Sequence, residues 1–324
     1  MRYLLRRGLH ALVLLFGVSI LTFLFSALTP GTYFDEMRLN PQISPETVAA
    51  LKAQSQLDRP LPVRYLHWLN ALVHGNLGFS FAYNEPVAPL LWTRACNTLL
   101  LTLSATLLAW LIGLPLGIWS ASHLHRPPDR LVSAGTATLL VIPDLVLALG
   151  LLILAVRTGW FPTGGLTSTN YDTLPSLQKL RDLASHMVLP VLALTLSALP
   201  TIVRHVRAAI ADELHSPFLR AAAAHGIPPR KLLYNYALRA AANPLIGLLG
   251  FSVGTLLSGS LLVEVIMTWP GLGPLLLESI LARDFFVVIA GVLFSMLFLV
   301  AGNLLADLLL CLADPRIRNA EHSQ

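Results

Sequence analysis

Charged residues are scarce in this chain of 324 residues, in which Asp, Glu, Lys and Arg together make up 12% of the sequence. Hydrophobic residues make up 55%, and the mean hydropathy is +0.68. Soluble domains carry roughly 25% charged residues, so this composition excludes an ordinary soluble enzyme and predicts a polytopic membrane protein surrounded by lipid. The net charge is +5. No basic patch with interleaved aromatic residues is present, however, which argues against binding to nucleic acid.

Reactive motifs are also missing. The two cysteines, Cys96 and Cys311, lie at the ends of separate apolar segments and predict no disulfide. The sequence lacks the zinc motif His-Glu-x-x-His and a phosphate-binding loop of the type Gly-x-x-x-x-Gly-Lys-Ser/Thr. The loop histidines show no metal-ligand spacing: His67, His74, His123, His125 and His225. We therefore expect no catalytic site, metal or cofactor, and no ATPase site in the chain itself.

Six apolar runs are candidates for membrane spans, each of which needs about 20 residues. They are residues 9–28, 97–121, 131–156, 187–203, 244–267 and 285–311. Pro143 breaks the third run, and Pro190 and Pro200 are expected to bend the fourth. The predicted fold class is an all-α polytopic membrane protein with six transmembrane helices.

The basic residues predict the orientation of the spans. One side of the six runs carries Arg2, Arg6, Arg7, Arg126, Arg130, Arg204, Arg207, Arg316 and Arg318. By the positive-inside rule, both termini are then cytoplasmic. The first run is longer than the core of a signal peptide, so an uncleaved transmembrane helix is expected in residues 1–29. An extracytoplasmic insert follows at 30–94, then a transmembrane core at 95–312 with a cytoplasmic loop at 205–243, and a cytoplasmic tail at 313–324.

The cytoplasmic loop contains a basic segment, residues 218–244, with the sequence FLRAAAAHGIPPRKLLYNYALRAAANP. This sequence predicts an alanine-rich helix that ends near His225. Gly226 suits a left-handed C-cap, and the following Pro-Pro pair suits the start of a second helix that reaches about Ala242. The segment is therefore predicted to form two short helices joined by a tight turn.

Two surfaces are expected on this segment. Residues 221–224 offer a flat alanine face that another surface can approach closely. An apolar stripe is expected on the second helix at Leu232, Leu233, Tyr236, Ala237 and Ala240. Arg230 and Lys231 are then left to face a polar partner. We interpret the segment as a docking element.

The docking segment resembles the cytoplasmic "EAA" loop of the permeases of binding-protein-dependent ABC importers, whose pattern is Glu-Ala-Ala, three residues and then Gly. Here Arg-Ala-Ala at 220–222 precedes Gly226, so Arg replaces the Glu. The Ala-Leu-Arg at 237–239, followed by Pro244, is similar to the peptide/nickel branch of these permeases, which includes dipeptide and oligopeptide permeases.

The resemblance extends over nearly the whole chain. Gly-Asn-Leu-Gly-Phe-Ser at 75–80 is similar to the family pattern Gly-Asp-Leu-Gly-x-Ser, with Asn76 in place of the Asp. Glu264 and then Pro-Gly-Leu-Gly at 270–273 match a family signature, and Asp-Pro-Arg at 314–316 matches the tail of the branch. Docking loop, Pro-Gly-Leu-Gly turn and tail together make the resemblance specific.

This resemblance implies a permease subunit beside a second, homologous permease subunit in the bacterial cytoplasmic (inner) membrane. It also implies two cytoplasmic ATPase subunits that bind the docking loop and an extracytoplasmic solute-binding protein. ATP binding would close the ATPase dimer, the docking helices would move with it, and the bundle would switch from inward-open to outward-open, so that ATP hydrolysis in the partners drives transport. The expected docking residues are Arg220, Ala221, Ala222, Gly226, Arg230, Lys231 and Arg239.

A second set of residues is expected to lie along the translocation path or at its gate: Asp144, Glu264, Pro270, Gly271, Gly273 and Asp307. A carboxylate in a membrane span is costly, so Asp144 should face the bundle interior or water. Asp144 either contacts a polar or cationic part of the cargo or only pins the kink at Pro143. Glu264 and Asp307 either line the path or fix the packing of helices.

Two alternative functions are a secondary transporter and a membrane scaffold without transport. A secondary transporter usually carries an internal repeat, and none is recognisable here. A scaffold without transport has no need of a cytoplasmic loop that is shaped to bind an ATPase subunit. The sequence leaves the substrate open among dipeptides, oligopeptides, nickel chelates, sugars and antimicrobial peptides.

Overall fold

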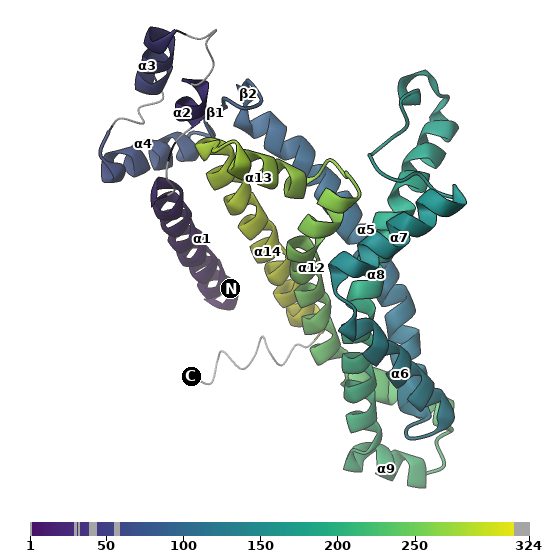
Figure 1. Ribbon diagram of the computed structural model, residues 1–324. Helices are drawn as coiled ribbons and strands as arrows, with labels where there is room; N and C mark the ends of the chain where they lie inside the picture. Colours follow the sequence, from purple (N-terminus) through teal and green to yellow (C-terminus); the bar gives the residue numbers. More distant parts are fainter. Residues whose placement is uncertain (1, 29–30, 32, 39–43, 55–58, 314–324) are drawn as a thin grey trace. The chain divides into compact units, whose positions relative to one another are not determined.

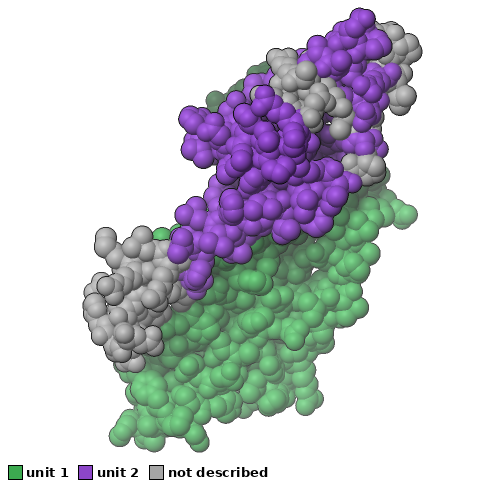
Figure 2. All heavy atoms as spheres, turned by 90° about the vertical axis from the view of Figure 1, so that its left-hand side faces the viewer, with its two compact units in different colours: residues 1–4, 99–269, 299–324 green, residues 5–98, 270–298 purple. Residues whose placement is uncertain are grey.

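The computed structural model describes residues 2–28, 31, 33–38, 44–54 and 59–313. The tail pattern at 314–316 therefore lies outside the described residues. The chain forms two compact units, shown in different colours in Figure 2. Unit 1 contains residues 1–4, 99–269 and 299–324, and unit 2 contains residues 5–98 and 270–298.

Helices dominate both units (Figure 1), as the predicted fold class requires. Five single helices among the described residues are long and apolar enough to cross a membrane, and a sharply bent pair of helices can provide a sixth span. The five are α1 (Arg2–Leu28), α5 (Val87–Ser122), α8 (Ser176–Leu214), α12 (Ala242–Ile266) and α14 (Phe285–Ala313). The prediction of six spans is confirmed if the bent pair is counted as one.

The bent pair consists of α6 (Pro127–Val141) and α7 (Asp144–Thr158), whose axes differ by 96°. Pro143 explains the break, because it lacks an N–H and disfavours helical geometry in the preceding residue. Ile142 accordingly has an extended conformation, with φ −79° and ψ 119°. The third apolar run, 131–156, predicts a single span that is interrupted at Pro143, with Asp144 near its middle. Instead, Asp144 is the first residue of a separate helix.

Two helices extend beyond the predicted limits of their spans. The helix α5 begins at Val87, inside the segment 30–94 that was expected to be an insert. The helix α8 has 39 residues and continues through Pro190 and Pro200, well beyond the predicted limits 187–203. The reason is that apolar composition marks only the part of a helix suited to lipid, whereas the helix continues as long as its backbone bonds are satisfied.

The remaining elements of unit 2 are short. They are α2 (Tyr33–Met37), α3 (Pro45–Gln54), α4 (Leu61–Val73), the antiparallel strands β1 (Phe79–Ser80) and β2 (Glu85–Pro86), and α13 (Leu272–Leu281). The pattern Ser-Pro-Glu at 44–46 predicts the start of a helix, and α3 begins there, with the Ser44 hydroxyl accepting a bond from the Thr47 N–H at 3.2 Å. Phe23, Trp68 and Ile289 form one of the cores of this unit.

The core of unit 1 depends on close contact between α5 and α8. Gly117 of α5 lies against Val206 of α8, where an added Cβ would approach the Val206 side chain to 2.6 Å. Gly113 lies one turn earlier against Ile202, with a corresponding distance of 2.7 Å. Small residues at such positions let two helices pack backbone to backbone in a membrane. The pair α5 and α8 is thereby brought together near the end of α8 that leads into the docking segment.

Candidate functional site

The docking segment connects α8 directly to α12. It contains α9 (Pro217–Ala224), α10 (Pro229–Lys231), a π-helix (Leu232–Ala237) and α11 (Leu238–Ala240). Figure 1 shows α9 at the extremity of unit 1, beyond the end of α8. Only His215 and Ser216 separate α8 from α9, and only Ala241 separates α11 from α12. A movement of this segment therefore acts on two spanning helices at once.

The turn between the two halves forms where the sequence predicts it. Ser216 caps α9, its hydroxyl accepting a bond from the Leu219 N–H at 3.3 Å. The helix ends at Ala224, and Gly226 has a φ of +78°, in the left-handed region that glycine adopts without strain. The Gly226 N–H donates to the Ala223 carbonyl oxygen at 2.9 Å. The predicted left-handed C-cap is thus confirmed.

The second half departs from the expected α-helix. Residues 232–237 form a π-helix, which widens the turn and inserts one extra residue into the helical register. Ala237 is buried and Leu233 packs against the core that contains Ile202 and Val206, whereas Ala240 is exposed. The predicted stripe at i, i+4 and i+8 is therefore wrong at its last position, because the extra residue rotates Ala240 away from the core.

The exposed face of the docking segment is strongly basic. Six of the seven expected docking residues are exposed: Arg220, Ala221, Gly226, Arg230, Lys231 and Arg239. Ala222 is buried and faces the same interior as Leu219, three residues before it. The expectation of one flat face over residues 221–224 is wrong, because adjacent residues of a helix point in different directions.

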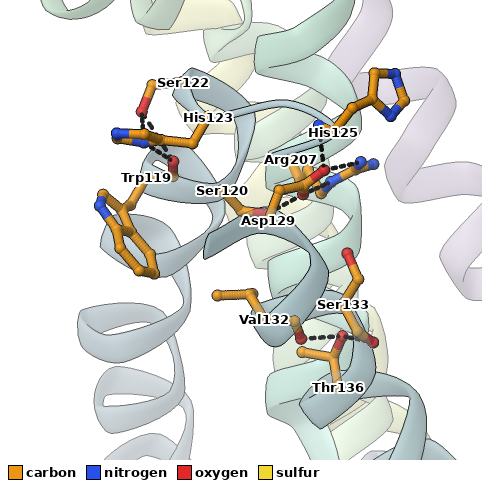
Figure 3. Close-up of polar contacts among 10 residues, drawn as sticks. All are labelled: Trp119, Ser120, Ser122, His123, His125, Asp129, Val132, Ser133, Thr136 and Arg207. Carbon is orange, nitrogen blue, oxygen red and sulfur yellow. Dashed lines mark hydrogen bonds and ion pairs between the residues drawn. The ribbon is translucent and has the colours of Figure 1, made fainter. Parts of the chain in front are cut away.

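A cluster that the sequence did not reveal anchors α6 to α5 and α8 (Figure 3). We call it the Asp129 cluster, and it consists of Asp129, Ser120, Arg207 and the His125 backbone N–H. Asp129 Oδ1 accepts bonds from Ser120 Oγ at 2.6 Å and Arg207 Nε at 2.5 Å. Asp129 Oδ2 accepts from Arg207 Nη2 at 2.8 Å and from the His125 N–H at 2.8 Å. The Asp129 side chain is 4% exposed and that of Arg207 is 28% exposed.

The geometry of the Asp129 cluster joins three elements through one carboxylate. The guanidinium forms a bidentate pair with it, which gives directional specificity as well as attraction. Asp129 stands in the first turn of α6, where an acid is favoured, and the sequence could have suggested that much. Its partner Arg207 is 78 residues away in the sequence, however, and no local sequence pattern predicts the pairing.

Asp144 is the first residue of α7 and lies just beyond the end of α6. Its Oδ1 accepts a bond from Ser197 Oγ of α8 at 2.6 Å, and its side chain is half-buried. The two ends of α6 are thus both tied to α8, through Asp129 at the start and through Asp144 just beyond the end. This contact is compatible with either of the two roles expected for Asp144.

The other path candidates occupy separate places. Glu264 of α12 is buried, and its Oε1 accepts a bond from Ser260 Oγ at 3.0 Å within unit 1. Asp307 of α14 is also buried. In unit 2, the Pro270 carbonyl oxygen accepts a bond from Asn97 Nδ2 at 2.8 Å.

Gly271 and Gly273, the remaining candidates, are buried at the start of α13. The Leu272 N–H between them donates to the hydroxyl of Thr98 at 2.8 Å. The beginning of α13 is thereby held against α5, and both glycines are part of a packed turn.

Comparisons with known proteins cover almost the full chain. The sequence model of the family described as "Binding-protein-dependent transport system inner membrane component" matches residues 113–319, and a model of the N-terminal part of such components matches residues 1–102. The oligopeptide transport system permease protein AppB of Bacillus subtilis is 35% identical over 97% of this chain and 98% of its own.

Other relatives carry different cargo names. The nickel import system permease protein NikB of Staphylococcus aureus is 34% identical over 97% of this chain and 91% of its own. The glutathione transport system permease protein GsiC of Salmonella typhimurium is 33% identical over 98% of this chain and 99% of its own.

A solved structure shares the fold. The inward-facing MetNI methionine ABC transporter matches with a TM-score of 0.56 and 20% identity, over 69% of this chain and 96% of the matched chain. The matched family models, the full-length relatives and the bundle of spanning helices agree with the docking loop and the Pro-Gly-Leu-Gly signature. The chain therefore belongs to the family of binding-protein-dependent transport system inner membrane components and is a permease subunit of an ABC importer.

Proposed function

We propose that this permease subunit moves short peptides or related small solutes across the bacterial cytoplasmic membrane. The cargo assignment is supported by the names of the full-length relatives, among which oligopeptide and glutathione permeases occur beside nickel permeases. Peptides and glutathione share amide bonds and free carboxylates. A single substrate class can therefore account for most of these names.

The observation that carries the coupling mechanism is the exposed basic face of the docking segment. This face lies on the short helical connection between α8 and α12. ATPase subunits that bind the face can move both helices when their own dimer closes, and the permease then alternates between two states. The Asp129 cluster supports this role, because it ties α6 to α8 close to the docking segment. The helices α6, α8 and α12 can therefore move together.

The assembly follows from the same reasoning. The chain carries no phosphate-binding loop motif, so the energy comes from two cytoplasmic ATPase subunits. A second, homologous permease subunit completes the path, and an extracytoplasmic solute-binding protein delivers the cargo. Both termini and the docking segment lie in the cytoplasm, whereas the predicted insert at 30–94 lies outside as far as the start of α5 at Val87.

Charge reversal on the docking face tests the proposal. The complex is reconstituted in proteoliposomes, and peptide uptake and peptide-stimulated ATPase activity are measured for the wild type and for a variant with Arg230→Glu and Lys231→Glu. Each lost charge-assisted contact contributes about 1.5–3 kcal/mol, so association with the ATPases should weaken on the order of 10-fold or more. The control Arg157→Glu reverses an exposed charge at the end of α7 and should behave as the wild type.

The alternatives predict different results. A secondary transporter would take up cargo with an ion gradient and without ATPase subunits. A scaffold would show no uptake under either condition. Peptide uptake that survives the double reversal with unchanged ATPase coupling would remove the docking assignment.

A further inference from the structure

An open groove of about 760 Å³ lies between α6 and α8 in unit 1. On α8 its lining includes Thr201, Arg204 and Ala208, which recur every three to four residues and therefore share one face of the helix. On α6 the lining recurs in the same way from Val132 to Val141. The groove thus follows both helices lengthwise.

The pairing of the two helices defines the ends of the groove. Asp129 near the start of α6 contacts Arg207 of α8, whereas Asp144 just beyond the end of α6 contacts Ser197. The helices are therefore antiparallel. The first turns of α6 accordingly line the end of the groove at Arg204, and the last turn of α6 lines the opposite end.

The end of the groove at Arg204 is polar and positively charged. Arg207 lies at this end, but its charge is compensated by the bidentate contact with Asp129 (Figure 3). The exposed Arg204 guanidinium makes no hydrogen bond or ion pair with any residue that the structure describes. The hydroxyls of Ser133 and Thr201 also line the groove and have no hydrogen-bond partner among those residues either. One guanidinium and two hydroxyls can therefore donate to an external anion.

The opposite end of the groove is apolar. It is lined by Ala137, Leu140 and Val141, and the last two side chains are 51% and 81% exposed. Ser133 and Val141 are eight positions apart on α6, which corresponds to roughly 12 Å along the helix at about 1.5 Å per residue. A ligand that fits both ends therefore joins an anionic group to an extended apolar chain.

The apolar runs of the sequence relate the groove to the membrane. Arg204 directly follows the predicted span 187–203, and the run 131–156 begins two residues before Ser133. The apolar end of the groove lies deeper within that second run. In the proposed topology, the Arg204 guanidinium is level with the headgroups of the cytoplasmic leaflet. Anionic lipids give this leaflet a negative surface potential, and basic pockets between transmembrane helices bind their headgroups.

We propose that the groove between α6 and α8 binds an anionic phospholipid of the cytoplasmic leaflet. The lipid phosphate accepts bonds from Arg204, whose planar donors match phosphate geometry, and from the hydroxyls of Ser133 and Thr201. One acyl chain lies along the apolar end of the groove. The lipid then contacts both helices that the Asp129 cluster joins. The inference uses the proposed topology and is independent of the cargo.

The test uses the complete importer in proteoliposomes with two photoreactive lipids, a phosphatidylglycerol and a phosphatidylcholine that carry the same diazirine in one acyl chain. At probe concentrations below saturation, phosphatidylglycerol should label the last turn of α6 more strongly than phosphatidylcholine. Loss of a charge-assisted contact in Arg204→Gln predicts a decrease on the order of 10-fold for phosphatidylglycerol, and less than about 2-fold for phosphatidylcholine. The matched control is Arg130→Gln, an exposed cation of α6 outside the groove lining, which should be labelled as the wild type is.

A second variant addresses the acyl chain. Ala137→Phe adds a ring at an exposed position inside the apolar end and should lower labelling of the last turn of α6 by both lipids. Ala134→Phe places the same side chain at an exposed position of α6 outside the lining and should leave the labelling unchanged.

Two results would overturn the proposed lipid site. One is equal labelling by the two lipids that Arg204→Gln leaves unchanged. The other is a cysteine at Val141 that crosslinks to the second permease subunit in the complex, because a protein would then cover the groove. Lipid labelling and crosslinking are the readouts, and uptake is not, so failure of the lipid site leaves the proposed cargo and coupling intact.

Discussion

Removal of the Asp129 carboxylate should destabilise the permease strongly, because one side chain holds three helices. Breaking a buried ion pair by deleting one partner costs about 3–5 kcal/mol. Arg207 keeps 28% of its side chain exposed and can reach water, so Asp129→Ala should cost less, about 2–3 kcal/mol. Arg207→Ala leaves the carboxylate with the Ser120 hydroxyl and the His125 N–H, and its cost should be about 2 kcal/mol.

The double variant separates the contribution of the Asp129–Arg207 ion pair to stability from that of the other contacts of the two residues. Once Asp129 is absent, removal of Arg207 loses little more, so the double variant should cost about 3 kcal/mol and not the sum of the single costs. Free energies of unfolding are measured by SDS titration of the purified protein in mixed micelles, followed by tryptophan fluorescence. The control Arg130→Ala, an exposed residue on the next position of α6, should stay within about 0.5 kcal/mol of the wild type.

If the stability losses of the two single variants add in the double variant, Asp129 and Arg207 are not coupled. A coupling below about 0.5 kcal/mol would mean that the bidentate contact contributes nothing specific. The same variants should also lower peptide uptake per ATP hydrolysed, because α6 no longer moves with α8.

Three further predictions concern the docking turn, the contact of α5 with α8, and the topology. Gly226→Val places a β-branched residue at φ +78°, where strain of about 1–3 kcal/mol should reduce uptake and peptide-stimulated ATPase activity in the importer, whereas Gly226→Asn should be tolerated; equal activity of the two variants would contradict this. Gly117→Ala brings a methyl group to 2.6 Å from the α8 side chains and should cost about 1–3 kcal/mol in the SDS titration, while Gly135→Ala, with nothing within 4 Å, should not destabilise the protein. In a chain whose native cysteines are replaced, a cysteine at Asn84 should react with an impermeant reagent on intact cells and one at Ser323, outside the described residues, should not; the opposite result would reverse the proposed topology.

The sequence by itself predicted the features that depend on neighbouring residues. Apolar runs of sufficient length indicated the spanning helices, since a helix in lipid satisfies its backbone within itself. The turn at Gly226 could be placed because the left-handed C-cap and the following prolines are local chemistry. Pro143 likewise predicted a break in the third span, although it did not predict that the helix axes on either side differ by 96°.

Elements whose form depends on packing were predicted less well. The π-helix at residues 232–237 has no composition that distinguishes it from an α-helix, so the exposure of Ala240 could not be foreseen. Ala222 looks the same as its alanine neighbours in the sequence, and its burial is decided by which side of α9 faces the interior. Hydropathy also could not predict that α5 begins at Val87.

Only the tertiary structure decided which polar groups meet. Asp129 and Arg207 are 78 residues apart, and Asp144 and Ser197 are 53 residues apart. Each pair forms because α6 and α7 pack along α8 with a particular rotation and offset, and these are set by the fit of many apolar side chains. A hydrogen bond depends on distance and direction in space, whereas a local sequence pattern specifies only the face on which a side chain lies.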